Sequence, residues 1–304
     1  PYSGVAGRQL SGSVDLDLSG SAQGDLSGFD VDFDLTGADL SAGGIALSGG
    51  IAARGTALRG PNGETDIDLT AQGPGGLELD LEAAGTESLR VDLSAQIDSL
   101  STYAGLIGQD IAGGFSADVS GTTRIDFSIF DLGIDATVRS IDVGIPAVAD
   151  LLRGVGTIDG RVGRRADGTL SASNLDVDFP NFSVTGDFDS QGGGGGSFDA
   201  RLADVGLFVP DLNGAATARG TARMRPGGGV TLDISATGPG GIAADVSGSV
   251  GGGGALNLNI DGQAPLQLAN PYIDPRRLSG MATFDIGVNG PPALSSVTGT
   301  VNIA

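Results

Sequence analysis

Apolar and polar residues alternate along most of this chain. The segments 14–18, 29–35 and 175–179 place Val, Leu or Phe at every second position and Asp at most of the positions between them. Successive side chains of a β-strand point to opposite faces, so each segment would form a strand with one apolar and one acidic face. The pattern predicts a two-faced β-sheet, and this geometry is a better guide to function than any catalytic residue.

The same alternation recurs along the whole sequence. Further runs cover residues 65–69, 77–81, 91–97, 125–129, 182–188, 230–236, 256–260 and 284–288. Clusters of Gly, Pro, Asn and Asp separate the runs at 60–63, 73–76, 167–168, 226–227 and 238–240. These residues supply the positive φ angles and preset bends that hairpins need. Turns at this spacing predict an antiparallel meander of roughly 20 short strands.

Three segments have a helical pattern instead, namely residues 101–107, 145–152 and 271–275. The first opens with Ser101, a possible N-cap, and the second has Pro146 at a first-turn position with Leu151 and Leu152 on one face. We expect short helices or helical turns at all three places.

A short phrase follows each helical segment and also occurs elsewhere: an aliphatic residue, one further residue, a glycine, and then a strand that ends at a second glycine. The glycine pairs are Gly12 and Gly20, Gly113 and Gly121, Gly154 and Gly160, Gly214 and Gly220, and Gly280 and Gly290. Every separation is even, which places both glycines on the same strand face if no bulge intervenes. The phrase indicates irregular internal repeats.

Composition removes several classes of function. The chain has 304 residues and a formal net charge of -21, with 37 acidic and 16 basic residues, which argues against nucleic acid or an anionic membrane as a main partner. It has no His and no Cys, so imidazole bases, thiolate nucleophiles and His/Cys zinc sites are excluded. No long apolar run suggests a membrane-spanning helix. We expect no enzymatic activity and no cofactor.

The abundant carboxylates do not form a recognisable metal or catalytic site. An EF-hand starting at Asp30 would need Gly and Glu where Leu35 and Ser41 stand. Aspartates two residues apart on one strand, such as Asp15 and Asp17, lie roughly 7 Å apart on an exposed face. The glycine runs 192–196 and 251–254 lack the Lys and helix of a phosphate-binding loop. We expect no metal site, and we interpret the glycine runs as hairpin turns or disordered tips.

The apolar face of the predicted sheet needs a cover, which could be a second sheet, helices, lipid or another ligand. Trp is absent and Tyr is rare, so neither the aromatic girdles of a transmembrane barrel nor the usual aromatic anchors of a sandwich are present. A lining of Leu, Val, Ile, Ala and Phe suits alkyl chains. It also suits an ordinary aliphatic core, so composition leaves both open.

Residues 269–294 read ANPYIDPRRLSGMATFDIGVNGPPAL. This stretch resembles the L-S-G, D and G-P-x-A-L phrase of repeats in the TamB/AsmA-like envelope proteins of Gram-negative bacteria. Residues 152–160 are a looser echo, and the rest of the chain resembles the family in pattern. The resemblance implies a β-taco, an antiparallel sheet folded lengthwise into an open hydrophobic groove, with a few short helices.

The resemblance also implies function. The chain would be a middle segment of a bridge-like conduit in the periplasm, which carries phospholipids between the inner and outer membranes and supports outer-membrane biogenesis. Phospholipid acyl chains would lie in the groove. An Omp85-family barrel similar to TamA would bind through regions outside this chain, and an inner-membrane anchor would also lie outside it.

As a hypothesis, the residues that contact acyl chains are the apolar positions of the alternating runs. They are Val14, Leu16, Leu18, Phe29, Val31, Phe33, Leu35, Ile67, Leu69, Leu79, Val91, Leu93, Ile125, Phe127, Leu175, Val177, Phe179, Val184, Leu232, Ile234, Leu258, Phe284 and Ile286.

We expect one continuous groove segment over residues 1–304, with approximate sub-units at 1–99, 100–144, 145–209, 210–269 and 270–304. Two other classes of protein stay open. A closed β-sandwich or β-solenoid, serving as a surface stalk or adhesin, would bury the same apolar stripe against itself. A carboxylate-based glycoside hydrolase would need an aromatic sugar cleft that this composition hardly supplies.

Overall fold

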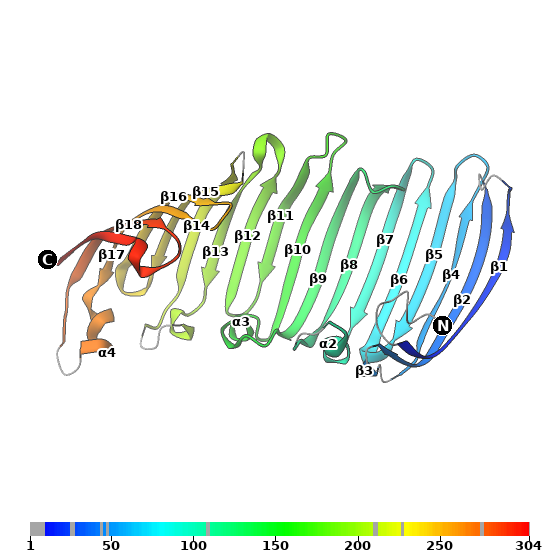
Figure 1. Ribbon diagram of the computed structural model, residues 1–304, viewed down its shortest axis with the longest axis horizontal. Coiled ribbons are helices and arrows are strands. Elements are labelled where there is room, and N and C mark those ends of the chain that lie inside the picture. The colour runs from blue at the N-terminus through cyan, green and yellow to red at the C-terminus, as the bar shows by residue number, and fades with distance from the viewer. Residues whose placement is uncertain are drawn as a thin grey trace. The chain divides into compact units, whose positions relative to one another are not determined.

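A computed structural model describes residues 10–24, 28–42, 45–46, 49–107, 110–208, 212–225, 228–273 and 277–303. The chain forms two compact units, unit 1 over Pro1–Gly168 and unit 2 over Thr169–Ala304. Both are antiparallel β-sheet with a few short helices (Figure 1). The predicted all-β antiparallel class is therefore confirmed, whereas the five predicted sub-units stay a prediction.

Unit 1 contains the strands β1 (Leu10–Ala22), β2 (Phe29–Ala42), β3 (Ile45–Ala46), β4 (Ile51–Arg59), β5 (Thr65–Gly73), β6 (Leu77–Gly85), β7 (Ser88–Ile97), β8 (Ala112–Arg124), β9 (Phe130–Asp142) and β10 (Val155–Arg164). Its helical elements are the 3₁₀ turn η1 (Pro74–Gly76), α2 (Ser101–Ile107) and α3 (Pro146–Leu151). Each strand pairs with the next in sequence, except that β2 pairs with both the two-residue β3 and β4.

Unit 2 contains the strands β11 (Leu170–Asp178), β12 (Phe182–Asp189), β13 (Gly195–Leu202), β14 (Ala216–Met224), β15 (Gly229–Gly238), β16 (Ile242–Gly251), β17 (Leu256–Pro265), β18 (Met281–Gly290) and β19 (Val297–Ile303). Its helical elements are η2 (Gln191–Gly193), η3 (Val205–Leu207), η4 (Pro239–Gly241), η5 (Leu266–Ala269), α4 (Asn270–Ile273) and η6 (Leu294–Ser296). Successive strands again pair in an antiparallel meander. Neither unit closes into a barrel by the pairings described.

The predicted elements largely match. The helix predicted at 101–107 coincides with α2, and the second prediction overlaps α3, where Pro146 occupies the first turn. The third overlaps α4, although residues 274 and 275 lie outside the described residues. The predicted turn at 226–227 also lies outside them. One predicted strand is wrong: residues 125–129 form the turn between β8 and β9.

The first glycine of each recurring pair lies at or near the start of a strand, in a conformation that only glycine adopts easily. The first glycine of each pair has a positive φ, for example 103° at Gly113. A side chain at Gly113 would lie 2.6 Å from the carbonyl oxygen of Arg139. Register shifts beside Gly12 and Gly113 indicate bulges at these positions. In these two pairs an even separation therefore does not place both glycines on the same strand face.

The two ends of the strands differ in unit 1. In unit 1 the helical elements η1, α2 and α3 connect strands at one end, here called the helical end, and short turns at 60–64, 86–87 and 125–129 connect them at the other, the hairpin end (Figure 1). In unit 2 the connections that contain η3, η4 and α4 share one end, whereas those that contain η2 and η6 lie at the other. This follows from the meander, because alternate connections fall at the same end.

A long stretch of unit 1 recurs in unit 2 with a constant offset. Residues 52–57, Ala-Ala-Arg-Gly-Thr-Ala, correspond to Thr-Ala-Arg-Gly-Thr-Ala at 217–222, and Gly-Pro-Gly-Gly at 73–76 corresponds to the same letters at 238–241. Every counterpart lies 165 residues later. The structures agree, since β4, β5, η1 and β6 correspond in order to β14, β15, η4 and β16. The internal repetition expected from the glycine phrase is thus accompanied by a longer, regular duplication.

Glycines at matching strand positions of the two copies leave room for neighbouring strands. A Cβ at Gly55 would lie 2.3 Å from the carbonyl oxygen of Asp68, which is too close for a real contact. It would also lie 3.0 Å from the ring of Phe33, at the limit of close contact. A Cβ at Gly220 would lie 2.5 Å from the carbonyl oxygen of Asp233. These glycines allow a large apolar side chain to lie across an adjacent strand, an arrangement that stabilises strand glycines.

We predict that Gly55→Ala and Gly220→Ala each lower the free energy of unfolding by about 1–3 kcal/mol, because the added methyl group overlaps a backbone oxygen. Urea unfolding followed by circular dichroism measures the change. Gly133→Ala is the matched control, because its nearest neighbour is a carbonyl oxygen 3.6 Å away. Equal stability of Gly55→Ala and the control would contradict the steric argument.

Candidate apolar binding face

The strands of unit 1 place their apolar side chains in continuous rows on one face, here called the apolar face. Residues directly opposite each other in an antiparallel pair point to the same side. One row crosses nine strands through Leu16, Leu35, Ala53, Ala71, Leu79, Ala95, Ala117, Ala136 and Ile158. The next row contains Leu18, Phe33, Gly55, Leu69, Leu81, Leu93, Val119, Ile134 and Gly160.

Unit 2 has an apolar face of the same kind. One row runs through Leu175, Gly186, Phe198, Gly220, Ile234, Val246, Ile260, Ile286 and Gly299. Large and small residues often sit opposite each other, as Phe198 does between Gly186 and Gly220. Such pairing keeps the face apolar without tall ridges.

No protein layer covers these faces among the described residues. Most of their side chains are half-buried, and the buried apolar residues are Ala83, Leu89, Phe179 and Ala282. No described side chain is fully buried. The 29.9 kDa chain exposes 18077 Å², whereas a globular protein of that mass exposes about 11,700 Å². The side chains are shielded by neighbours on their own face, as in a single-layer sheet.

The opposite face of each sheet, here called the water face, holds the carboxylates. One row of unit 1 reads Asp17, Asp34, Arg54, Thr70, Asp80, Ser94, Asp118, Asp135 and Asp159. Arg54 donates a hydrogen bond to Thr70 Oγ1 at 3.2 Å, and the guanidinium of Arg161 forms two bonds with the carboxylate of Asp131. Like charges opposite each other are unfavourable unless solvated, so this face requires water.

Twenty of the 23 predicted contact residues lie on the apolar faces. Those in unit 1 are Val14, Leu16, Leu18, Phe29, Val31, Phe33, Leu35, Ile67, Leu69, Leu79, Val91 and Leu93. Those in unit 2 are Leu175, Val177, Val184, Leu232, Ile234, Leu258, Phe284 and Ile286. The structure assembles each group on one face, although their contact with acyl chains stays a prediction.

Three predicted residues lie in turns. Phe179 follows β11 and is buried, with its ring stacked on Phe182 at 6.0 Å. Ile125 and Phe127 belong to the β8–β9 turn, where Phe127 is 65% exposed and has a φ of 55°. A positive φ is unusual for a bulky residue. Residues 125–129 form a turn although apolar and polar residues alternate there. The N–H of Arg124 donates a hydrogen bond to the carbonyl oxygen of Ile129, which closes the hairpin between β8 and β9.

Sequence reasoning missed the apolar-face residues of several strands, although the glycine phrase predicted strands that overlap β10 and β14. β4 and β14 contribute mainly Ala and Gly, and β9 and β10 contribute Leu132, Ile134, Ile158 and Val162. In β9 and β10 apolar and polar residues do alternate, but Gly or Ala replaces some of the large apolar residues. Alanine and glycine are poor strand formers, so neighbouring strands had to be known before β4 could be recognised.

One row at the hairpin end of unit 1 differs in chemistry from the rest of the apolar face. It reads Ala22, Phe29, Arg59, Thr65, Gly85, Leu89, Thr123, Phe130 and Arg164. We call it the rim row. Thr65 and Thr123 are buried, and their hydroxyls bond nearby carbonyl oxygens. Along the described ladders, Arg59 and Arg164 are the charged residues of the apolar faces, and carboxylates do not occur there.

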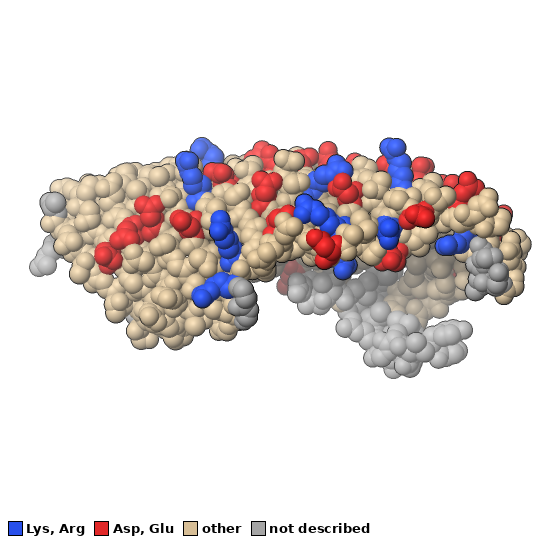
Figure 2. All heavy atoms as spheres, turned by 90° about the horizontal axis from the view of Figure 1, so that it is seen from above, with Lys and Arg blue, Asp and Glu red and all other residues tan. Residues whose placement is uncertain are grey.

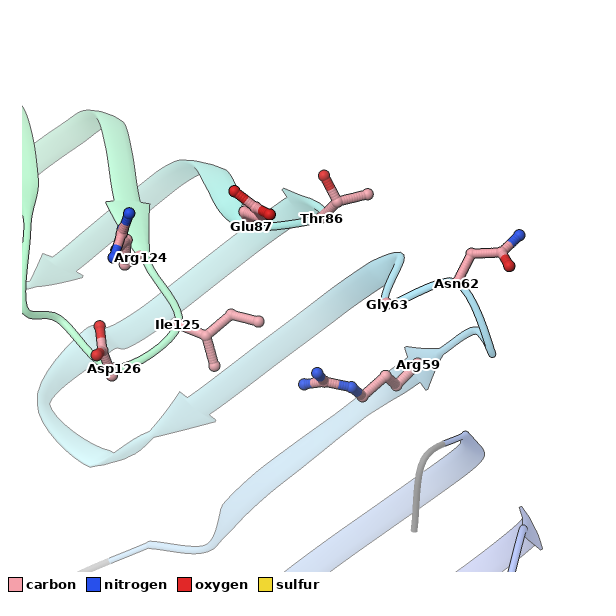
Figure 3. Close-up of a pocket in the computed structure, with 8 residues that line it drawn as sticks. All are labelled: Arg59, Asn62, Gly63, Thr86, Glu87, Arg124, Ile125 and Asp126. Carbon is pink, nitrogen blue, oxygen red and sulfur yellow. The ribbon is translucent and has the colours of Figure 1, made fainter. Parts of the chain in front are cut away.

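A hollow of about 520 Å³ opens at the hairpin end beside Arg59. Three turns line it, contributing Asn62, Glu87 and Asp126 among others. Figure 3 shows the side chains of Arg59 and Ile125 extending from opposite sides into the space between these turns. Charged side chains of both signs are spread over the surface seen from this end (Figure 2).

Among the residues described, no group of three His, Cys, Asp or Glu side chains is placed to hold a metal ion. The described helices include none long and apolar enough to cross a membrane. Scans of family models, curated protein sequences and solved structures gave no match to the chain.

We predict that the Asp131–Arg161 pair stabilises unit 1 above about pH 4 and that this contribution disappears in acid. The hydrogen bond from Arg161 holds the pKa of Asp131 below its ordinary value. A lowered pKa in the folded state means that stability is lost as pH falls through that pKa. Thermal melts from pH 7 to pH 2.5 test this: Asp131→Asn should melt lower than the unsubstituted chain at pH 7, and the gap should close in acid. A gap independent of pH would contradict the role of the charge.

Proposed function

We propose that this chain binds lipid acyl chains along its apolar faces and passes them on as a segment of a lipid conduit in the bacterial periplasm. The observation that carries the proposal is a face of nine strands in unit 1 whose inner rows lack charge and which no other described segment of that unit covers. Apolar area in water is unfavourable at about 25 cal/mol per Å². Acyl chains remove that area from water without needing hydrogen-bond partners.

The sheet is proposed to curl lengthwise into a β-taco with the apolar face inside. Sheets twist and coil unless something holds them flat, and curling would bring both ends of the strands around a bound chain. The even lining of Leu, Val, Ala and Gly would let an alkyl chain slide, because no polar group along the inner rows would hold it. Transport in this view is passive and follows the row direction.

The wider setting rests on the likeness of residues 269–294 to TamB/AsmA-like repeats. In that setting the conduit joins the inner and outer membranes, supports outer-membrane biogenesis, and meets an Omp85-family barrel through regions outside this chain. The acidic water face supports a place in aqueous surroundings, since its rows of carboxylates require solvent.

We predict that the 304-residue chain, expressed in the periplasm of a Gram-negative host and purified without detergent, carries phospholipid. Native mass spectrometry and lipid extraction would detect it. If the chain instead folds as a closed sandwich or solenoid stalk, it buries the apolar stripe against itself and leaves no room for lipid. Absence of phospholipid under these conditions would favour the stalk.

We predict that Leu93→Asp abolishes lipid retention while leaving the free energy of unfolding within about 1 kcal/mol of the original, because the face is covered by lipid rather than protein. Lipid per protein is measured by mass spectrometry and stability by urea unfolding in lipid-free buffer. Ser116→Asp is the matched control, since it adds the same charge to the water face of the neighbouring strand, opposite the uncharged Gln96 and Thr137.

The two measurements separate the alternatives. A closed core would make Leu93→Asp destabilising by more than about 3 kcal/mol, because a charge would be buried without a partner. Retention of lipid by the Leu93→Asp chain would refute an acyl strip at this row.

A further inference from the structure

The apolar face of unit 1 is polar at one end only. Its inner rows contain no charged residue, and the row at the helical end contains apolar residues and glycine, among them Ile51, Ile97 and Phe115. The rim row at the opposite end contains Arg59 and Arg164. Each is the final residue of its strand. The face therefore has an orientation, apolar at the helical end and cationic at the hairpin end.

The sign of these two charges is unexpected for this chain. Acidic residues outnumber basic ones by 37 to 16, yet the described ladder positions of both apolar faces contain no carboxylate. If charge were placed at strand ends without selection, an acid would be the commoner outcome. In unit 2 the corresponding face has no charged residue at all along its described ladders.

Arg59 and Arg164 also lack a carboxylate partner. The described ion pairs involve Arg90, Arg139, Arg153 and Arg161, and neither rim arginine has a hydrogen bond or ion pair within the described part of the chain. Both guanidinium groups are therefore available to a ligand. Glu87 and Asp126 line the hollow beside Arg59, but they lie in turns outside the ladder. The Asp126 carboxylate already accepts bonds from the N–H and hydroxyl of Ser128.

The dimensions fit an amphiphile that lies along a strand. From Arg59 to Ile51 the apolar face extends roughly 27 Å at about 3.3 Å per residue. One acyl layer of a bilayer is about 15 Å thick, half of its hydrocarbon core. A headgroup at the rim row thus leaves the whole acyl chain on apolar residues. Arg59 and Arg164 are separated by six strand spacings, roughly 29 Å, so they would serve two different lipids.

We infer that Arg59 and Arg164 bind the anionic headgroups of lipids whose acyl chains lie on the apolar face of unit 1. This inference rests on the proposed function and adds to it an orientation, with headgroups at the hairpin end and tails toward the helical end. A guanidinium group binds a phosphate by paired, charge-assisted hydrogen bonds. Asn62 and Thr86 line the same hollow as Arg59 and offer further polar groups.

The test compares two amphiphiles with the same twelve-carbon chain, dodecyl phosphate and the uncharged dodecyl maltoside, below their micelle concentrations. Binding to the lipid-free 304-residue chain is measured by calorimetry. We expect dodecyl phosphate to bind about tenfold more tightly than dodecyl maltoside, which corresponds to one charge-assisted contact at a partly exposed site. In Arg59→Gln/Arg164→Gln this preference should disappear while dodecyl maltoside still binds.

Two matched variants complete the test. Arg54→Gln/Arg90→Gln removes the same number of charges from the water face and should keep the preference. Arg59→Lys/Arg164→Lys keeps the charge and should retain part of it. Circular dichroism verifies that each variant is folded.

Several outcomes would overturn the inference. The first is that Arg59→Gln/Arg164→Gln still prefers dodecyl phosphate to dodecyl maltoside. The second is that the water-face control loses this preference to the same extent. The third is that inorganic phosphate at equal concentration competes with dodecyl phosphate, which would indicate a free phosphate site. All three leave dodecyl maltoside binding intact. Failure of both amphiphiles to bind any form of the chain would instead contradict the proposed function itself.

Discussion

The structure depends on one constraint: an apolar sheet face cannot remain in water without a cover. In an ordinary domain a second layer provides that cover. Within the described residues of each unit no second layer packs on the apolar rows, and the strands are held by backbone ladders and by contacts between side chains of the same face. Backbone hydrogen bonding fixes the register, but it contributes little net free energy for each bond. Under the proposed function, lipid acyl chains would supply the missing apolar contacts, and the ligand would then contribute to the stability of the fold.

The same constraint explains the glycine content and the duplication. A long single-layer sheet needs an even surface and local freedom to coil. Gly55 and Gly220 occupy matching positions in two copies that are 165 residues apart, and both approach a backbone oxygen of the next strand too closely for any larger residue. Phe33 and Phe198 correspond in the same way. The repetition of these steric details indicates that the architecture grew by copying a unit of several strands.

Much of the fold was predictable because a period of two residues is a direct consequence of strand geometry. The runs in β2, β5, β7 and β17 needed no tertiary information, and α2 was recognisable from its helical pattern. The turn at 125–129 was not predicted, since Ile125 and Phe127 alternate with polar residues as a strand would. The row that contains Arg59 and Arg164 was also beyond sequence reasoning. It joins Arg59 to Arg164, more than 100 positions away, through six strand pairings, and register cannot be read from one strand.

The distribution of charge between the two faces connects fold and function. A strand that alternates Asp with Leu could satisfy solubility alone, and then occasional carboxylates on the apolar face would be tolerated at strand ends, where water has access. The described ladders contain none, and the charges present there are two arginines at a single end of unit 1. Carboxylates at that end would repel an anionic headgroup, whereas guanidinium groups would hold it. Exclusion of acids from the apolar face is therefore better explained by the proposed amphiphilic ligand than by solubility, and it gives that face a polar and an apolar end.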